Sequence, residues 1–159
     1  SNFSISNLKE LIENSGKKPE MNQVELHPLL QQHDLLDFCK IENIHVTAYS
    51  PLGSMDRNPS FKAEDEPNLF ENSVIKTIAE KNNCTSAQVL IKWAIQRGTA
   101  VIPKSTNPER LKQNYDAQNI VLSADDMNEL SSLDKEYRFI NGGFWAMEGS
   151  PYSLKDIWG

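Results

Sequence analysis

Cysteines are scarce in this sequence, and no motif pairs them. The chain of 159 residues has two, Cys39 and Cys84, which lie far apart and lack the Cys-x-x-Cys spacing of redox and metal motifs. Both fall in helix-like surroundings, so free thiols in a reducing compartment are the plain interpretation. The first residues also lack the hydrophobic core of a signal peptide. These two absences predict a cytoplasmic protein.

Long hydrophobic runs and an excess of positive charge are absent too. No window approaches the run of about 18 apolar residues that a membrane span needs. The formal net charge is −6, so the chain has no broad positive field to hold a nucleic-acid backbone or an anionic membrane. An anionic ligand must therefore be bound by a few local cations. A content of 38% hydrophobic and 24% charged residues is typical of a globular domain.

Two common signatures of cofactor sites are missing. The 7 glycines do not form the Gly-x-Gly-x-x-Gly pattern of Rossmann-type dinucleotide sites. The 3 histidines, His27, His33 and His45, have no metal-ligand spacing, so we expect no metal. His27 stands before a proline at the end of a predicted strand, and we interpret it as a structural, hydrogen-bonded residue rather than an acid–base catalyst.

What the sequence does contain is a regular alternation of helix and strand patterns. Strands are predicted at 20–26, 45–50 and 99–102. Helices are predicted from a cap at Ser4 or Ser6 to Gly16, from about 32 to 43, around 74–79, from the Thr85–Gln88 capping box to Gly98, from Asn107 to about Tyr115, and a last one after Ser123. Residues 53–70 are predicted to form a long polar loop, and an irregular tail follows from 135.

This order of elements predicts an α/β fold with parallel strands joined by right-handed crossovers. Three parallel strands leave two edges unpaired and one face of the sheet in need of cover. The pattern also begins with a helix that no strand precedes. We therefore expect the chain to be one part of a larger fold.

Four short motifs stand at or just beyond strand ends. They are Ser1-Asn2-Phe3, Asn22-Gln23-Val24-Glu25-Leu26-His27-Pro28, Ala48-Tyr49-Ser50-Pro51-Leu52-Gly53 and Ile102-Pro103-Lys104-Ser105, with Arg110 and Asn114 after them. In this order and spacing the chain resembles the aldo-keto reductases along nearly its whole length. The resemblance implies the C-terminal half of a (β/α)8 TIM barrel at residues 1–134 and a tail over the substrate pocket at 135–159. Barrel active sites lie at the carboxyl ends of the strands, where the motifs fall.

A candidate anion site surrounds the start of the helix that follows the third strand. Lys104, Ser105 and Arg110 bring two cations and a hydroxyl close to the free N–H groups of that helix. The spacing alone also allows a solvated lysine and an arginine paired along its own helix. The resemblance implies that these three residues hold the adenosine 2′-phosphate of NADPH, and it makes Thr106 a further cofactor-binding residue. NADP is then the expected cofactor, with NADH as a weaker alternative.

The adenine and nicotinamide ends of the cofactor are assigned from the same resemblance. Asn114 keeps the adenine-contacting type of the family, whereas Gln113 replaces the Glu of many relatives. Tyr49 would stack on the nicotinamide ring, although its position also suits a core tyrosine at a barrel rim. The carboxamide of that ring would be held by Ser1, Asn2 and Gln23, whose side chains can donate and accept hydrogen bonds.

The long loop after the second strand is the remaining part of the predicted cofactor site. The resemblance places Ser50, Leu52, Ser54 and Asp56 near the pyrophosphate and makes the loop a belt whose movement limits cofactor release. Simple surface disorder is the alternative for a loop this polar. In the tail, Phe139, Phe144, Trp145 and Trp158 either contact a small carbonyl substrate or only seal the barrel rim.

The resemblance also implies a function, the reduction of aldehydes or ketones to alcohols by hydride transfer from NADPH. The family's catalytic Tyr, Lys, Asp and His belong to the N-terminal half of the barrel, so we expect no catalytic residue in this chain. That half is the expected partner, in a full-length protein that is a monomer or a weak dimer. A non-catalytic dinucleotide-binding protein and a structural or regulatory protein on the same barrel are the alternatives.

Overall fold

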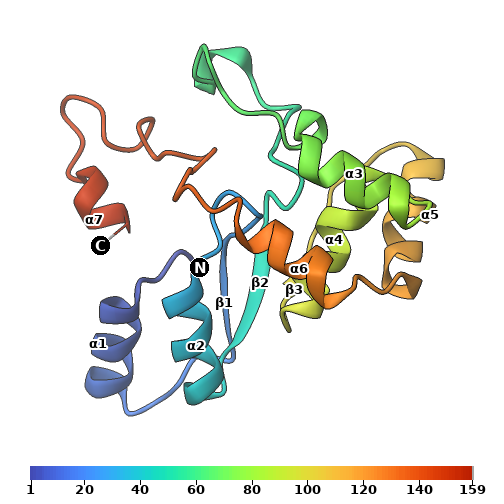
Figure 1. Ribbon diagram of the computed structural model, residues 1–159. Helices are drawn as coiled ribbons and strands as arrows, with labels where there is room; N and C mark the ends of the chain where they lie inside the picture. Colours follow the sequence, from blue (N-terminus) through green and yellow to red (C-terminus); the bar gives the residue numbers. More distant parts are fainter. Residues whose placement is uncertain (159) are drawn as a thin grey trace.

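Helices and strands alternate along the chain as the sequence predicts. The computed structural model describes residues 1–158, and Figure 1 shows the strands between two groups of helices. The elements are α1 (Ile5–Ser15), β1 (Met21–Glu25), α2 (His33–Glu42), β2 (His45–Tyr49), α3 (Ser73–Lys81), α4 (Ser86–Gln96), β3 (Ala100–Val101), α5 (Pro108–Asp116), α6 (Ala124–Ser131) and α7 (Leu154–Trp158). Short 3-10 turns lie at η1 (Pro59–Phe61), η2 (Leu69–Glu71) and η3 (Ala117–Asn119).

The strands form one parallel sheet in the order β1-β2-β3. Glu25 at the end of β1 is paired with Tyr49 at the end of β2, so the carboxyl ends of these two strands are level. The third strand is shorter than the predicted 99–102, although the N–H of Ile102 still donates to the carbonyl of Ala48 at 3.2 Å. The loops that follow the strands consequently begin at one edge of the sheet, where the sequence motifs lie.

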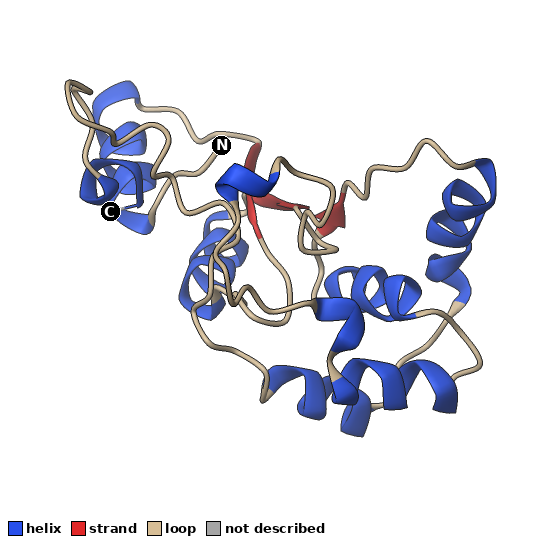
Figure 2. Cartoon of the chain, turned by 90° about the horizontal axis from the view of Figure 1, so that it is seen from above, coloured by secondary structure: helices blue, strands red, loops and turns tan. Residues whose placement is uncertain are grey.

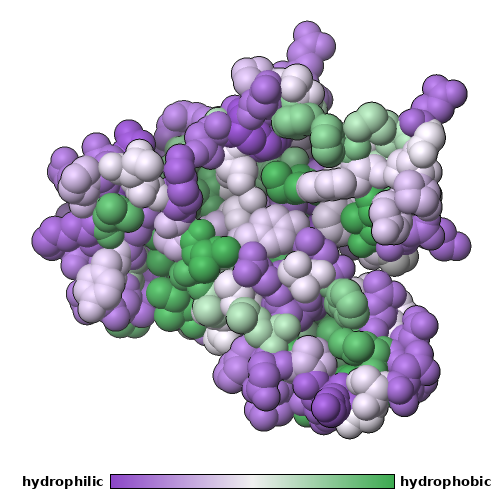
Figure 3. All heavy atoms as spheres, turned by 180° about the vertical axis from the view of Figure 1, so that it is seen from behind, coloured by the Kyte–Doolittle hydropathy of each residue, from purple (hydrophilic) through white to green (hydrophobic). Residues whose placement is uncertain are grey.

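Only one face of the sheet is covered by helices. Val24, Val46 and Ala48 point to the covered face and pack in a core that includes the fully buried Trp93. Alternate residues of β1 point to the other face, and one of them, Met21, is 50% exposed. Figure 2 shows the helices in an open arc around the strands, and Figure 3 shows hydrophobic side chains reaching the surface on one face. The sheet thus has the uncovered face and the unpaired edges expected of part of a barrel.

Local capping signals place the helix starts. Ser4, one of the two predicted caps, accepts the N–H of Asn7 at the start of α1. The predicted box of Thr85 and Gln88 is present at α4, because each side chain accepts the other residue's backbone N–H. These short-range hydrogen bonds satisfy backbone donors that would otherwise be free, which is why the sequence identifies them.

Two segments hold more regular structure than the sequence predicts. The loop at 53–70 contains the turns η1 and η2, in which Asn58 and Asn68 each accept a backbone N–H. The tail is irregular from 135 onward but ends in α7, so the helix after Ser123 is not the last. The indole N–H of Trp158 donates to the carbonyl of Asn141 at 2.8 Å and fixes α7 to the tail. None of the helices in residues 1–158 is long and apolar enough to cross a membrane.

Candidate functional site

A groove of about 700 Å³ lies between the loop after β2, the end of β3 and the first turns of α5. Most of the predicted site residues line it together, namely Ser50, Leu52, Ser54, Asp56, Lys104, Ser105, Thr106, Arg110, Gln113 and Asn114. Further lining residues that were not predicted for the site come from the start of α4 and include Thr85, Ser86 and Ala87. The structure therefore brings three separate stretches of sequence to one cavity.

The start of α5 supplies the most positive part of this groove. The side chain of Asn107 caps the helix by accepting the N–H of Arg110 at 3.1 Å, and Ser105 accepts the N–H of Asn107 at 3.2 Å. The guanidinium of Arg110 is exposed and has no hydrogen-bond or ion-pair partner within residues 1–158. Its five donors remain available to an anion beside the positive end of the helix.

One ion pair spans the groove. Lys104 Nζ lies 2.7 Å from Asp56 Oδ2, and the two side chains are 69% and 66% exposed. Lys104 lowers the pKa of Asp56 through a hydrogen bond and charge attraction. Because water screens an exposed pair, this bond contributes little to folding and can be exchanged for a bond to a ligand. The pair connects the loop after β2 to the end of β3.

The loop wall of the groove begins with a strained turn. Ser50 and Ser54 both have positive φ, 48° and 49°, a conformation that non-glycine residues rarely adopt. Their hydroxyl oxygens are 2.6 Å apart, and the two residues flank Gly53, whose φ is 83°. Unusual backbone of this kind often lies at binding sites, because the surrounding structure must hold it in place. Here it turns two hydroxyls toward the groove.

The four residues assigned to the nicotinamide end lie outside this groove. The N–H of Asn2 donates to the carbonyl of Gln23 at 2.8 Å, and Gln23 and Tyr49 share the uncovered face of the sheet. Asn2 lines a second groove of about 770 Å³ between α1, α2 and the tail. Its Oδ1 atom is buried and has no partner in residues 1–158. Ser1 is exposed beside Asn2.

The hydroxyl of Tyr49 is a weaker acid than a free tyrosine. Burial and the negative charge of Glu25 raise the pKa of Tyr49 to about 12, against an opposing effect of Arg138. The phenol therefore stays protonated at neutral pH and holds its proton more tightly than a donor to a carbonyl requires. This property agrees with a tyrosine that contacts a ligand through the face of its ring rather than by donating a proton.

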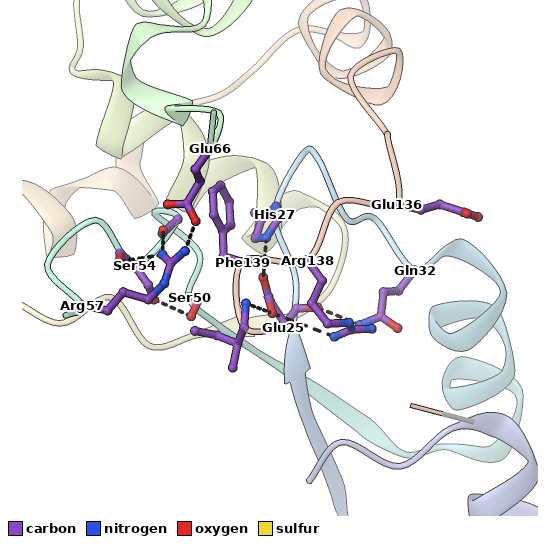
Figure 4. Close-up of polar contacts among 12 residues, drawn as sticks. Glu25, His27, Gln32, Ser50, Ser54, Arg57, Glu66, Glu136, Arg138 and Phe139 are labelled. Atoms are coloured by element: carbon purple, nitrogen blue, oxygen red, sulfur yellow. Dashed lines mark hydrogen bonds and ion pairs between the residues drawn. The ribbon is translucent and has the colours of Figure 1, made fainter. Parts of the chain in front are cut away.

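A buried carboxylate at the end of β1 is a feature that sequence reasoning missed. Figure 4 shows Glu25 beneath the tail, where its oxygens accept the N–H groups of Phe139 at 2.6 Å and Ile140 at 3.1 Å. His27 Nε2 lies 3.0 Å from the same carboxylate, and both side chains are fully buried. His27 is thus the structural, hydrogen-bonded residue that we expected. The two backbone partners in the tail lie more than a hundred residues along the chain, so no local signal identifies them.

The comparisons with known proteins decide the family. The sequence model described as "Aldo/keto reductase family" matches residues 1–135. The chain belongs to the aldo/keto reductase family. The relatives agree with this assignment: aldo/keto reductase slr0942 from Synechocystis sp. is 51% identical over 158 residues, which is 99% of this chain and 48% of the relative. An NADPH-dependent D-xylose reductase from Meyerozyma guilliermondii is 44% identical over 149 residues, covering 91% of this chain and 46% of that protein.

Solved structures confirm the fold of this chain. The apo crystal structure of Gox0644 matches with a TM-score of 0.74 and 38% identity over 85% of this chain and 45% of that one. A substituted form of Gox0644 in complex with NADPH matches equally well, with a TM-score of 0.74. The α/β prediction is confirmed, and the chain covers part of a (β/α)8 barrel. It spans less than half the length of the curated relatives described above.

The described part of the chain offers no cluster for a metal ion. Within residues 1–158, no three His, Cys, Asp or Glu side chains lie close enough together to ligate one. Apart from the carboxylate of Asp56, which is paired with Lys104, the polar side chains of the groove are lysine, arginine, hydroxyl and amide groups. Such donors suit phosphate and carboxamide oxygens rather than a cation.

Proposed function

We propose that this chain forms the dinucleotide-binding part of an NADPH-dependent reductase of aldehydes or ketones. The observation that carries the proposal is the free guanidinium of Arg110 beside Lys104 and Ser105 at the start of α5. A 2′-phosphate is a dianion that needs several donors at one point, and this is where the groove presents them. The xylose reductase relative is named for NADPH, and Gox0644 has been solved with it.

The remaining groove residues divide along an extended dinucleotide. Gln113 and Asn114, one turn beyond Arg110, suit the adenine. The hydroxyls of Ser50 and Ser54 suit the pyrophosphate, and Leu52 and Asp56, the latter neutralised by Lys104, would lie near it. Tyr49 offers a ring at the uncovered face of the sheet, and Ser1, Asn2 and Gln23 supply groups for the carboxamide. The unpartnered Oδ1 of Asn2 is an acceptor that fits a carboxamide N–H.

NADPH supplies the hydride when it is bound, and the residues of this chain bind and orient it. The raised pKa of Tyr49, about 12, makes its hydroxyl a poorer proton donor than a free tyrosine, which supports a role for its ring. This chain spans less than half the length of its relatives, and we assign the proton donor to the remaining part of the barrel. In the same proposal residues 1–134 form the barrel part and the tail from 135 covers the pocket of a small carbonyl substrate.

Two measurements on the full-length protein test the proposal. NADPH should quench tryptophan fluorescence on titration, with NADH binding more weakly, and NADPH absorbance should fall when a small aldehyde is added. Binding without turnover on a panel of aldehydes and ketones would indicate a non-catalytic dinucleotide-binding protein. A full-length protein that binds neither dinucleotide would refute the proposal.

A further inference from the structure

The loop at 53–70 and the C-terminal tail meet at one buried aromatic side chain. Phe139 is 2% exposed, and a Cβ atom on Gly53 would lie 3.3 Å from its ring. The guanidinium of Arg57 lies over the same ring, 5.5 Å from its centroid. Gly53 and Arg57 therefore pack directly on the tail, and they alternate in sequence with Leu52, Ser54 and Asp56, which line the groove.

Arg57 also holds the loop in its own shape. Its Nη1 donates to the carbonyl oxygens of Gly53 at 3.2 Å and Ser54 at 3.0 Å, and its Nη2 pairs with Glu66 near the other end of the loop. Both side chains of that pair are largely buried, and Figure 4 shows Arg57 between Ser54, Glu66 and Phe139. A single side chain thus connects the groove wall, the far end of the loop and the tail.

The tail has a fixed position at this contact because β1 holds it. The buried carboxylate of Glu25 accepts the N–H groups of Phe139 and Ile140, and the ring of Phe139 contacts His27 with centroids 4.8 Å apart. Since Glu25, His27 and Phe139 are buried and the carboxylate is bonded to all three partners, we expect the segment around Phe139 to be the least mobile part of the tail. It is a support on the rigid sheet against which the loop rests.

A second contact joins the loop to the tail farther out. The rings of Phe61 and Phe144 meet edge to face with centroids 5.6 Å apart, and both side chains are about half exposed. An aromatic pair at this geometry stabilises the contact beyond its buried area. Because neither ring belongs to the core, this contact can be removed without disturbing the fold.

We propose that the tail acts as a clasp that holds the loop at 53–70 closed over the groove, with Arg57 and Phe61 as the positioning residues of the loop. The loop closes the groove only while it rests on Phe139 and Phe144, and release of the dinucleotide requires these contacts to open. Substitutions in the tail, which lines no part of the groove, then change how fast the cofactor leaves. This inference rests on the proposed function for its ligand but not for the coupling between loop and tail.

The coupling is tested first without any ligand. In the full-length protein, Phe144→Ala should raise amide hydrogen exchange in the loop at 53–70 by about two- to tenfold, the range expected from loss of its pair with Phe61. Its other aromatic pair, with Trp145, lies within the tail and does not involve the loop. Phe144→Tyr keeps the ring and should restore the native rate. Tyr152→Ala is the matched control, since it removes an exposed tail aromatic that has no aromatic partner within residues 1–158. Unchanged loop exchange in Phe144→Ala would overturn the clasp whether or not NADPH binds.

The effect on release is then measured by stopped-flow dissociation of NADPH. Phe144→Ala and Arg57→Met should both speed dissociation, by about two- to tenfold, while association changes less. Faster loop exchange with an unchanged NADPH dissociation rate would refute the role in release and leave the proposed function standing. Failure of the native protein to bind NADPH would refute the proposed function and this role together, and loop exchange would still decide the coupling.

Discussion

The groove and the Glu25 site place polar groups at the same edge of the sheet, but they differ in how those groups are satisfied. Glu25 is fully buried, and its oxygens are occupied by backbone N–H groups and His27. Arg110 and Lys104 are exposed, and their only ion pair within residues 1–158 is the screened one to Asp56. A polar cluster that the chain satisfies by itself supports the fold, whereas one with spare donors can bind a ligand.

Removing Glu25 should have the largest effect, and the effect should be on stability. Glu25→Ala leaves the N–H groups of Phe139 and Ile140 and the ring of His27 buried without their acceptor. Each donor left without its acceptor costs about 1–3 kcal/mol, so the loss should reach about 3–5 kcal/mol in all. Urea denaturation of the full-length protein measures it, with the exposed Glu13→Ala as control. A loss below about 1 kcal/mol would show that the tail is not held by this carboxylate.

Arg110 should affect binding and leave stability unchanged. Its charge-assisted contact to a phosphate is worth roughly 1.5–3 kcal/mol, so Arg110→Met should weaken NADPH by about tenfold or more. NADH lacks the 2′-phosphate and should bind with little change. Lys112→Met, which removes a cation from the same helix that is paired with Asp116, is the control. Equal losses for both dinucleotides in a fluorescence titration would contradict the assignment of the phosphate end.

The two regions also differ in how far the sequence predicts them. The cap Asn107, the box of Thr85 and Gln88 and the groove residues near Lys104 follow from neighbours a few positions apart, or from motifs of the family. These signals are local, and the structure places most of the predicted residues around one groove. The nicotinamide assignments at the sheet face remain predictions.

The sequence did not predict the contacts of Glu25 or the helix α7, because both depend on long-range contacts. The bonds from Glu25 to Phe139 and Ile140 span 114 and 115 residues, so no window of sequence contains them. The five-residue helix α7 is too short to form by propensity. It is held by the bond of Trp158 to Asn141 and by Arg138, which lies 4.0 Å from the centroid of the Trp158 ring. Such elements depend on tertiary contacts that only the folded chain provides.

The pairs Asp126–Lys81 and Asp56–Lys104 provide a smaller test of the contrast between buried, satisfied groups and exposed ones. Burial alone would raise the pKa of Asp126, but hydrogen bonds from Lys81, Ser123 and Asn82 outweigh it and lower the pKa to about 2. The stability from this pair is present above the ordinary pKa of 3.8 and is lost as the pH falls toward 2.

Asp126→Asn should therefore destabilise the protein by about 1–2 kcal/mol at neutral pH, with the difference from the native protein shrinking in acid. Asp56→Asn, which changes the exposed pair with Lys104, should leave stability unaltered. Urea denaturation at several pH values compares the two variants. Equal losses of stability in both variants at neutral pH would contradict the claim that the buried aspartate supports the fold and the exposed one in the groove does not.

The smallest effect is expected at Tyr49, which stands between the two regions. It is paired with Glu25 in the sheet, and the hydroxyl has a pKa of about 12, so we predict that the ring and not the proton serves the proposed reaction. Tyr49→Phe keeps the ring, and carbonyl reduction at saturating NADPH should fall by less than about tenfold. Tyr49→Ala removes the surface and should chiefly weaken NADPH. A proton donor would behave differently, because its Phe variant loses the acid and typically about a hundredfold in turnover. A collapse of turnover in Tyr49→Phe with NADPH binding intact would therefore place the acid in this part of the barrel.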